Sequence, residues 1–342
     1  MTGLLRSLPH LREDRELLFR SLGENTGNLA FWESIRRLFA PAIVPYEAEK
    51  IKACGRVIVT DLIWIRRGAV YPVLEKLADA CPIPFIPMSV GVQSEGEGDF
   101  RLEKDTVRLL KKLEERAVIG VRGEYTAEVL SRHGIKNMAV IGCPSLYYWK
   151  NARLRIGEGP REGRCCANFR TFFGRLSAAE KHFLSYCADR NMLFVEQTAH
   201  KLTKEAASGD EAYYRYIASW LYGNSVLPFS YAEWRRALRG IRFSIGGRFH
   251  GNVVALWQGI KALFLTSDSR TRELTALFRL PAMETGDFDR NKPFSYYLGS
   301  ADYSAFNRCY KERYETFEWF AAKNGLRFTD ARPLAFGEKE EE

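Results

Sequence analysis

The stretch SIGGRFHGNVVALWQGIKALFLTSDSRTREL, residues 244–274, decides the expected fold. It completes an apolar strand, Ile241–Ile245, turns at two glycines, passes through a helical pattern at Asn252–Gln258 and enters a second apolar strand, Ala262–Leu265. Strand, helix and strand in this order are typical of a βαβ unit in a parallel sheet. Ligands bind beyond the carboxyl ends of such strands, so the GGRFH turn is the first place to expect a site.

The same alternation recurs on both sides of a segment rich in glycine and charge, Lys150–Arg164. Before this segment we expect strands at Arg56–Thr60, Pro84–Met88, Ala117–Gly120 and Met138–Ile141, with helices at Glu103–Glu115 and Tyr125–Arg132. After it we expect further strands at Arg164–Phe169 and Met192–Glu196, with helices at Ala178–Asp189, Glu211–Leu221 and Tyr231–Leu238. The length of 342 residues exceeds the usual size of a single core.

These patterns predict an α/β protein of two Rossmann-like domains that face one another across a cleft. The N-terminal domain is expected over residues 1–150 and the C-terminal domain over residues 164–301. An amphipathic helix, Tyr303–Asn324, lies within residues 302–325 and is expected to pack across both domains. Residues 337–342 have the composition of a charged tail.

Composition narrows the class of protein and its partners. Lys and Arg total 51 against 42 Asp and Glu, and the net charge of +9 favours an anionic partner. The basic residues form no block with interleaved aromatics, which argues against nucleic acid and leaves a membrane surface or a small phosphorylated substrate. Seven cysteines without CxxC pairs or zinc-type spacing indicate reduced thiols and no metal site.

The expected location follows from the same sequence features. No apolar run approaches the ~20 residues that span a bilayer, and the first residues lack an apolar signal core. We therefore expect a cytoplasmic protein that is attracted by its charge to the inner face of the membrane.

Arg248 and His250 stand between Gly247 and the expected helix start near Asn252, and Gly247 and Asn252 are also candidate substrate contacts. If the turn places them at a helix N-terminus, the exposed backbone N–H groups and the helix dipole favour a bound anion there. The alternative is that the glycines serve only the turn and that His250 caps the helix. The local pattern leaves both interpretations open.

Four segments resemble the polysaccharide pyruvyl transferase family: GENTGNLAFWESI (residues 23–35), VRGEYTAEVLSRHGIKNMAVIGCPSLYY (121–148), the Arg-x-His helix followed by GIKA, and TSDSRTRELTALFRLP (266–281). The resemblance spans most of residues 20–285. In the last segment Arg270 stands where members often carry lysine, which preserves charge but changes geometry.

The resemblance implies two Rossmann-like halves similar to the GT-B glycosyltransferases. It also implies phosphoenolpyruvate as the donor substrate, no separate cofactor, and a sugar diol of a glycan, or of its lipid-linked or nucleotide-linked precursor, as the acceptor. Members set pyruvate as a cyclic ketal on two hydroxyl groups and release phosphate.

A donor with a phosphate and a carboxylate needs at least two cations. Arg248 is the first candidate and is paired with His250 as the catalytic residues. Arg170 follows the expected strand CCANF and is the second, with a surface salt bridge as the alternative; Arg270 joins them. A neighbouring phosphate favours the imidazolium, so His250 is assigned as the general acid. The general base stays open among Asp268, Glu196 and Glu124.

On the acceptor side, Asn25, Gly27 and Asn28 form either a cradle for the acceptor or a phosphate, or a simple helix N-cap. Arg122 either lines the cleft from the first half or makes an ordinary ion pair. The cluster Tyr147–Trp149 is a candidate sugar-stacking platform, although such clusters are more often core.

Two other functions stay open. The same architecture serves glycosyltransferases that use nucleotide sugars, because a fold does not fix a function. A non-catalytic glycan-binding member of a polysaccharide-synthesis complex is the second alternative. The sequence gives neither the acceptor sugar nor the oligomeric state.

Overall fold

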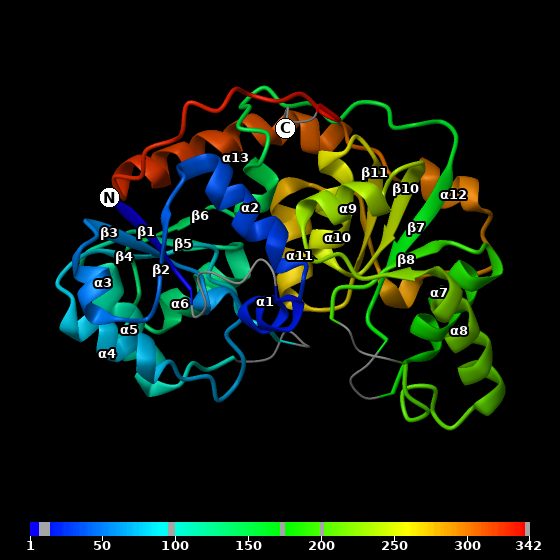
Figure 1. The fold of residues 1–342 in the computed structure, drawn as a ribbon, viewed down its shortest axis with the longest axis horizontal. Helices are drawn as coiled ribbons and strands as arrows, with labels where there is room; N and C mark the ends of the chain where they lie inside the picture. Colours follow the sequence, from blue (N-terminus) through cyan, green and yellow to red (C-terminus); the bar gives the residue numbers. More distant parts are fainter. Residues whose placement is uncertain (7–13, 95–99, 172–174, 199–201, 339–342) are drawn as a thin grey trace.

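The computed structural model describes residues 1–6, 14–94, 100–171, 175–198 and 202–338. Within them the chain forms two α/β halves, each built on a parallel sheet, that lie side by side (Figure 1). The last long helix runs along the top of the view and spans both halves.

The sheet of the first half has the strand order β2-β1-β3-β4. These strands are β1 (Thr2–Leu5), β2 (Ala42–Val44), β3 (Arg56–Val59) and β4 (Phe85–Pro87). A second parallel pair, β5 (Ile119–Val121) and β6 (Met138–Val140), continues this order through a bridge between Val90 and Val121. The direction of winding reverses between β1 and β3, which is where ligands bind in open α/β sheets.

The sheet of the second half has six parallel strands in the order β12-β11-β10-β7-β8-β9. They are β7 (Arg164–Asn168), β8 (Leu193–Val195), β9 (Ser225–Val226), β10 (Ile241–Gly246), β11 (Lys261–Thr266) and β12 (Ala282–Glu284). Numbered within this half and read from β9, the order is the Rossmann order 3-2-1-4-5-6, with its switch point between β7 and β10. The predicted pair of Rossmann-like domains in a GT-B-like arrangement is confirmed.

Helices cover both sheets (Figure 1). Those of the first half are α1 (Arg15–Ser21), α2 (Asn28–Phe39), α3 (Ala48–Lys52), α4 (Pro72–Ala80), α5 (Lys104–Glu114) and α6 (Glu124–Arg132). Those that follow β7 are α7 (Ala178–Asp189), α8 (Glu211–Asn224), α9 (Tyr231–Ala237), α10 (Phe249–Trp257), α11 (Ser269–Phe278), α12 (Phe294–Gly299) and α13 (Ser304–Lys323). Short 3₁₀ turns occur at η1 (Asp61–Ile63), η2 (Pro144–Tyr147) and η3 (Thr285–Asp287).

Each expected strand and helix is present, with ends displaced by up to three residues, and the displacement matters at α10. This helix begins at Phe249 instead of Asn252, so Arg248 is its N-cap and His250 lies in its first turn. Gly251 lies within this helix. A Cβ there would lie 2.6 Å from the Gln197 side chain, so the glycine serves close packing.

The C-terminal helix α13 contacts both halves. At its start the Tyr303 hydroxyl donates to the carbonyl of Ala262 in the second half (2.7 Å). Just beyond its end Asn324 accepts from the backbone N–H of Val118 in the first half (2.9 Å) and donates to the Val118 carbonyl (3.1 Å). The helix therefore ties the two sheets together at the face seen at the top of Figure 1.

One apolar core runs from the first sheet through the junction into the second sheet and α13. The aromatic cluster Tyr147–Trp149 is buried in it. The ring of Tyr147 stacks on Phe317 at 4.2 Å between centroids, and that of Tyr148 on Trp257 at 3.9 Å. The suggestion that this cluster stacks a sugar is wrong, because its rings are already covered by the protein.

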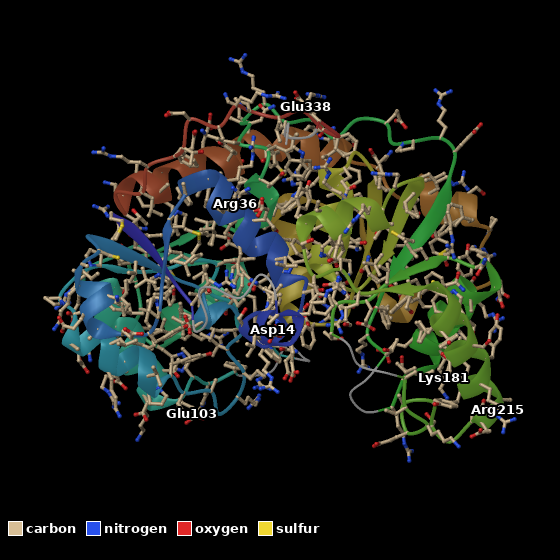
Figure 2. The ribbon with its side chains drawn as sticks, viewed as in Figure 1. Asp14, Arg36, Glu103, Lys181, Arg215 and Glu338 are labelled. Carbon is tan, nitrogen blue, oxygen red and sulfur yellow. The ribbon has the colours of Figure 1, made fainter. Side chains whose placement is uncertain are left out.

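Charged side chains lie exposed on both halves. Exposed Arg36 and Glu103 lie on the first half, and exposed Arg215 on the second (Figure 2). Among the helices that the structure describes, none is long and apolar enough to cross a membrane.

Candidate active site

The turn at the switch point of the second half contains two glycines, Gly246 and Gly247. A Cβ on Gly246, the last residue of β10, would lie 1.8 Å from the carbonyl oxygen of Asn168 at the end of β7. The backbone N–H of Gly247 donates to the same carbonyl (2.9 Å). This corrects the prediction that Gly247 binds substrate, because its N–H is already bonded within the turn.

A buried network of amides and a hydroxyl fixes the turn from inside. The side-chain oxygen of Asn168 accepts from the backbone N–H of Arg248 (2.9 Å), and its amide donates to Asn252 (2.8 Å). The amide of Asn252 donates in turn to the carbonyl of Gly246 (2.9 Å), and Ser244 donates to Asn252 (2.8 Å). Asn252 is fully buried, so it holds the turn and does not contact substrate, contrary to the prediction. Asn168 was not singled out in the sequence.

Arg248 lies at the end of this turn and extends toward the loop after β8. Its Nη2 donates to the hydroxyl of Thr198 (3.2 Å). Burial lowers the pKa of Arg248, while the carboxylate of Glu196 opposes that effect. An arginine stays charged in proteins, so this position carries a fixed positive charge in a half-buried place.

His250 points from the first turn of α10 into the first half. Its Nε2 lies 3.5 Å from the thiol sulfur of Cys143, which follows β6. Burial, followed by the charges of Arg122 and Arg270, lowers the pKa of His250 to about 3. Burial and these charges therefore favour the neutral imidazole, and the expected imidazolium depends on a neighbouring phosphate.

Arg122 and Arg270 reach this histidine from opposite halves. Arg122 follows β5 in the first half, is buried, and donates from Nε to the hydroxyl of Ser89 (3.1 Å). Arg270 lies in the first turn of α11 in the second half and pairs with Asp268 at 3.0 Å. Besides burial, Arg270 lowers the pKa of both Arg122 and Arg248, so the charges of these three guanidinium groups are linked through Arg270.

The three candidate bases differ in how their carboxylates are held. Oε1 of Glu196 accepts from the N–H of Gln197 (2.7 Å) and from the hydroxyl of Thr198 (2.9 Å). Asp268 is the N-cap of α11. Burial raises its pKa, but Arg270 and the bonds to the first turn of α11 outweigh burial and lower it overall. Glu124 is exposed at the start of α6.

Glu273 on α11 joins the two halves and was not found from the sequence. It accepts from the backbone N–H of Thr126 (3.0 Å) and from the Thr126 hydroxyl (2.8 Å), both in the first turn of α6. Burial raises the pKa of Glu273 to about 7, although the bonds from Thr126 and the nearby arginines lower it in part. A Cβ on Gly123 would lie 2.6 Å from Glu273, so the helices meet closely here.

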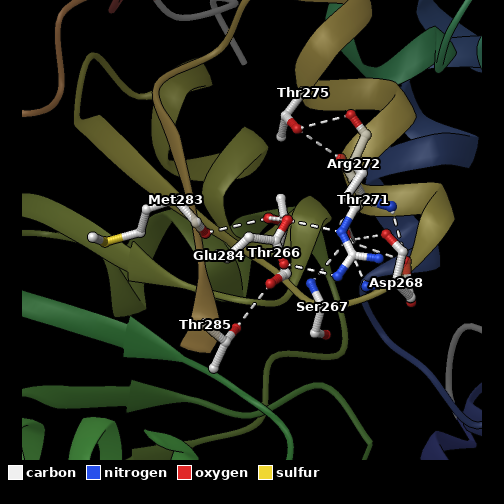
Figure 3. A network of polar contacts seen from close by, with 9 residues as sticks. All are labelled: Thr266, Ser267, Asp268, Thr271, Arg272, Thr275, Met283, Glu284 and Thr285. Carbon is white, nitrogen blue, oxygen red and sulfur yellow. Dashed lines mark hydrogen bonds and ion pairs between the residues drawn. The ribbon is translucent and has the colours of Figure 1, made fainter. Parts of the chain in front are cut away.

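Arg170, at the end of β7, forms the salt bridge that the sequence left as the alternative. Its Nε donates to Glu180 (2.6 Å), whose other oxygen accepts from the N–H of Ser177 in the capping box of α7. Glu180 also lines a cavity of about 380 Å³ with Arg272 and Glu284. Figure 3 shows that Arg272 and Glu284 are paired through two hydrogen bonds, of 2.7 and 2.8 Å. Compensated charges therefore line this cavity.

The Gly/Asn-rich segment before α2 is a contact between the halves. The N–H of Thr26 donates to the carbonyl of Gln197 (2.7 Å), and a Cβ on Gly27 would lie 2.1 Å from the Gln197 side chain. Asn25 accepts from the N–H of Gly27 (3.0 Å), and Asn28 donates to a carbonyl before the helix (2.8 Å). The N–H groups of Gly27 and Asn28 and the side chains of Asn25 and Asn28 are therefore bonded within their own segment, which corrects their assignment as acceptor contacts.

The family of the chain follows from a comparison of its sequence with family models. The model described as polysaccharide pyruvyl transferase matches residues 25–269. The chain belongs to this family. The match includes Arg122, Cys143, Arg248 and His250, and it ends one residue before Arg270.

No curated protein sequence matches this transferase. Among solved structures it is similar to UDP-GlcNAc 2-epimerase from Neisseria meningitidis bound to UDP-GlcNAc, at 12% identity over 93% of this chain and 100% of that chain, with a TM-score of 0.42. It is also similar to a functionally uncharacterised protein from Klebsiella pneumoniae, at 12% identity over 80% and 87% of the two chains, with a TM-score of 0.41. The glycosyltransferase VinC in complex with dTDP matches at 12% identity over 93% and 95%, with a TM-score of 0.36.

This pyruvyl transferase family member has seven cysteines. All seven cysteines are buried free thiols. Among the described residues, no group of three or more His, Cys, Asp or Glu side chains is arranged to hold a metal ion. The side chains described at this site are arginines, His250 and the thiol of Cys143.

Proposed function

We propose that this family member takes phosphoenolpyruvate as its donor and sets the three-carbon unit as a cyclic ketal on two hydroxyl groups of a sugar. The observation that carries the proposal is that Arg122 and Arg270, one from each half, act on the half-buried His250, and that Arg270 also acts on Arg248, two residues before this histidine. Phosphate and carboxylate on one small donor match forked guanidinium groups, which bind both kinds of anion through paired hydrogen bonds.

The reaction requires one proton on carbon and loses two from oxygen. The methylene carbon of the donor takes a proton, a first sugar hydroxyl bonds to the neighbouring carbon, and the bond from that carbon to the phosphate oxygen breaks. The second hydroxyl then closes the ketal. Of the two hydroxyl protons, one balances the new methyl group and the other leaves on phosphate. We assign the proton donor to His250, and Asp268 and Glu196 stay the candidates to accept a hydroxyl proton.

The low pKa of His250 implies that the bound donor also changes the protonation state of this histidine. Burial and the charges of Arg122 and Arg270 keep the imidazole neutral. An anion held by these arginines offsets their charges, so we expect it to raise the histidine pKa and to bring a proton with it. His250 then becomes an acid only when the donor is in place.

Two measurements test the proposed function. Phosphate release from phosphoenolpyruvate is followed with methyl glycosides, nucleotide sugars and lipid-linked sugars as acceptors, and acceptor-dependent release is expected. In Arg248→Ala we expect the affinity for phosphoenolpyruvate to fall by roughly 10- to 150-fold, because a charge-assisted hydrogen bond contributes about 1.5–3 kcal/mol. Release of a nucleoside diphosphate from a nucleotide sugar, with none from phosphoenolpyruvate, would identify a glycosyltransferase instead. Sugar binding without either reaction would identify a glycan-binding protein.

A further inference from the structure

Trp64 lies at the switch point of the first half and is partly exposed to solvent. It follows β3 and η1, beyond the carboxyl end of the strand next to β1. Ligands of open α/β sheets bind at this place. The side chain of Trp64 is 42% exposed, whereas tryptophan is highly buried on average.

The backbone next to Trp64 is fixed by the neighbouring loop. The N–H of Ile65 donates to the carbonyl of Gly91 (2.8 Å), and the N–H of Gln93 donates to the carbonyl of Ile65 (2.9 Å). Ile65 is 1% exposed and anchors the loop in the core. The indole is therefore held out by a packed neighbour and is not the tip of a loosely attached loop.

Two guanidinium groups lie over the indole. The Cζ of Arg66 is 4.2 Å from the ring centroid, and that of Arg270 is 5.4 Å away. Arg270 belongs to the second half and acts on His250, so it connects the exposed ring to the charged cluster. The same border is closed by Ser269, which accepts from the N–H of Ser94 (2.9 Å) and donates to the carbonyl of Val92 (2.9 Å).

We propose that Trp64 is the platform on which the sugar ring of the acceptor stacks, an assignment that rests on the proposed function for its link to catalysis. The C–H groups on one face of a pyranose carry positive partial charge, and the face of an indole is negative. A rigid tryptophan offers a large contact area at low cost in conformational entropy. With the ring on Trp64, the sugar hydroxyls on its border reach toward Arg270 and the donor.

The exposed Trp319 provides a matched control. It is 48% exposed on α13, and Lys323 lies over its ring at 5.8 Å, so its exposure and its cationic neighbour resemble those of Trp64. Its neighbour, however, belongs to α13 itself and not to the cluster around His250. Exposure alone therefore predicts equal behaviour of the two residues, and the platform predicts a difference.

Saturation-transfer NMR with methyl glycosides of glucose, galactose and mannose measures sugar binding, and calorimetry measures the binding of phosphoenolpyruvate. We expect Trp64→Ala to weaken glycoside binding at least about tenfold, since truncated tryptophans dominate the binding losses at interfaces. Trp64→Phe keeps a stacking face and should retain most of the binding. Trp319→Ala should match the wild type. The affinity for phosphoenolpyruvate should change little in all three variants.

Each result separates the platform from the proposed reaction. If glycoside binding depends on Trp64 but the protein never releases phosphate from phosphoenolpyruvate, the role of Trp64 as a platform stands and pyruvyl transfer is rejected. Equal glycoside binding by Trp64→Ala and the wild type, equal loss in Trp319→Ala, or no binding of any of the three glycosides by the wild type overturns the platform. A loss confined to phosphoenolpyruvate binding also overturns it, because Trp64 would then act only through Arg270.

Discussion

The turn after β10 and the junction between α6 and α11 hold the same site in different ways. At the turn, Asn168 and Asn252 bond to each other and to backbone groups of the turn, and both are fully enclosed. At the junction, one carboxyl group, Glu273, joins the halves, and its pKa lies near neutrality. The first contact has no titratable member and is fixed, whereas the second responds to pH.

This difference suggests a division of roles between the halves. The fixed turn sets the positions of Arg248 and His250 within the second half. The first half supplies Arg122 and Cys143, which reach His250 only while the halves stay together. Substitutions in the turn should therefore affect the site under all conditions, and substitutions at the junction should change its dependence on pH.

The largest expected effect is on His250, which the turn after β10 positions and which Cys143 of the first half contacts. His250→Gln keeps a hydrogen-bonding group but cannot deliver a proton, so turnover should fall by roughly 10²–10⁴-fold while the affinity for phosphoenolpyruvate changes little. Steady-state phosphate release and calorimetry measure the two quantities. Normal turnover in this variant would leave His250 as part of the helix start only.

Calorimetry of donor binding in buffers of different ionisation enthalpy sharpens this test. In the wild type we expect uptake of up to about one proton per phosphoenolpyruvate bound near pH 6, because the donor offsets the arginines that lower the histidine pKa to about 3. His250→Gln should show less uptake. Equal uptake by the two proteins would assign the proton to another group.

The next effect tests the fixed turn. Asn168→Ala leaves the backbone N–H of Arg248 and the oxygen of Asn252 with one partner fewer inside the protein. We expect the free energy of unfolding to fall by about 2–3 kcal/mol, because a buried polar group that loses its partner keeps its desolvation cost. Denaturant unfolding measures this change.

Asn151→Ala is the control for that change. Asn151 also makes two side-chain hydrogen bonds, to the carbonyl of Leu334 and from the N–H of Arg153, but it is only half-buried. Water replaces such bonds, so a smaller loss of stability and unchanged binding of phosphoenolpyruvate are expected. Equal losses of stability in the two variants would mean that the turn after β10 is no more tightly packed than the segment Lys150–Arg164.

The third effect tests the junction through pH. The folded protein holds the Glu273 proton up to about pH 7, whereas an unfolded chain releases it near 4.5. Folding therefore takes up a proton between these values, and the free energy of unfolding should fall as the pH rises through this window, by roughly 3 kcal/mol at most. In Glu273→Gln this fall should be absent.

Glu284→Gln is the comparison variant, because the stability contributed by Glu284 changes with pH in the opposite direction to that of Glu273. Arg272 holds the pKa of Glu284 below its ordinary value, so the stability from this carboxylate is present at neutral pH and is lost as the pH falls below that value. Unfolding followed from pH 3 to 8 compares the two variants with the wild type. A wild-type profile that Glu273→Gln does not alter would show that the junction does not titrate in this range.

Periodicity predicted the strands β3–β8, β10 and β11, about half of the helices and the βαβ unit that contains Gly246 and Gly247, because these depend on neighbouring residues. The strands β1, β2, β9 and β12 were not predicted. Arg248 and His250 were found in this way. Glu273 and Cys143 were not, since their partners lie 147 and 107 residues away in the chain. Nothing in a helical segment such as TRELTALF marks its glutamate as buried. Likewise the Asn of CCANF has no signal until β7 is known to lie beside β10.

Trp64 shows the same limit on the acceptor side. The sequence pointed to Tyr147–Trp149, the denser aromatic cluster, and the structure buries it. A cluster of aromatic residues marks a core as readily as a binding surface, because both are made by removing rings from water. A single tryptophan in a loop gave no pattern at all, and its exposure and its neighbour Arg270 appear only when the two halves are in place.

The smallest expected effect tests the contact of Cys143 with His250 across the two halves. Burial raises the pKa of the Cys143 thiol, so it stays protonated and can donate to the unprotonated Nε2, which leaves the ring proton on Nδ1. Cys143→Ala removes this bond and should lower turnover by roughly 2- to 10-fold, the equivalent of one neutral hydrogen bond. Cys143→Ser keeps a donor at the same place and should recover part of the rate. A purely packing role predicts instead that serine, which is more polar than alanine in a buried site, is the more harmful substitution. The order of the two variants in turnover, with their melting temperatures measured alongside, therefore decides whether the first half orients the histidine or only surrounds it.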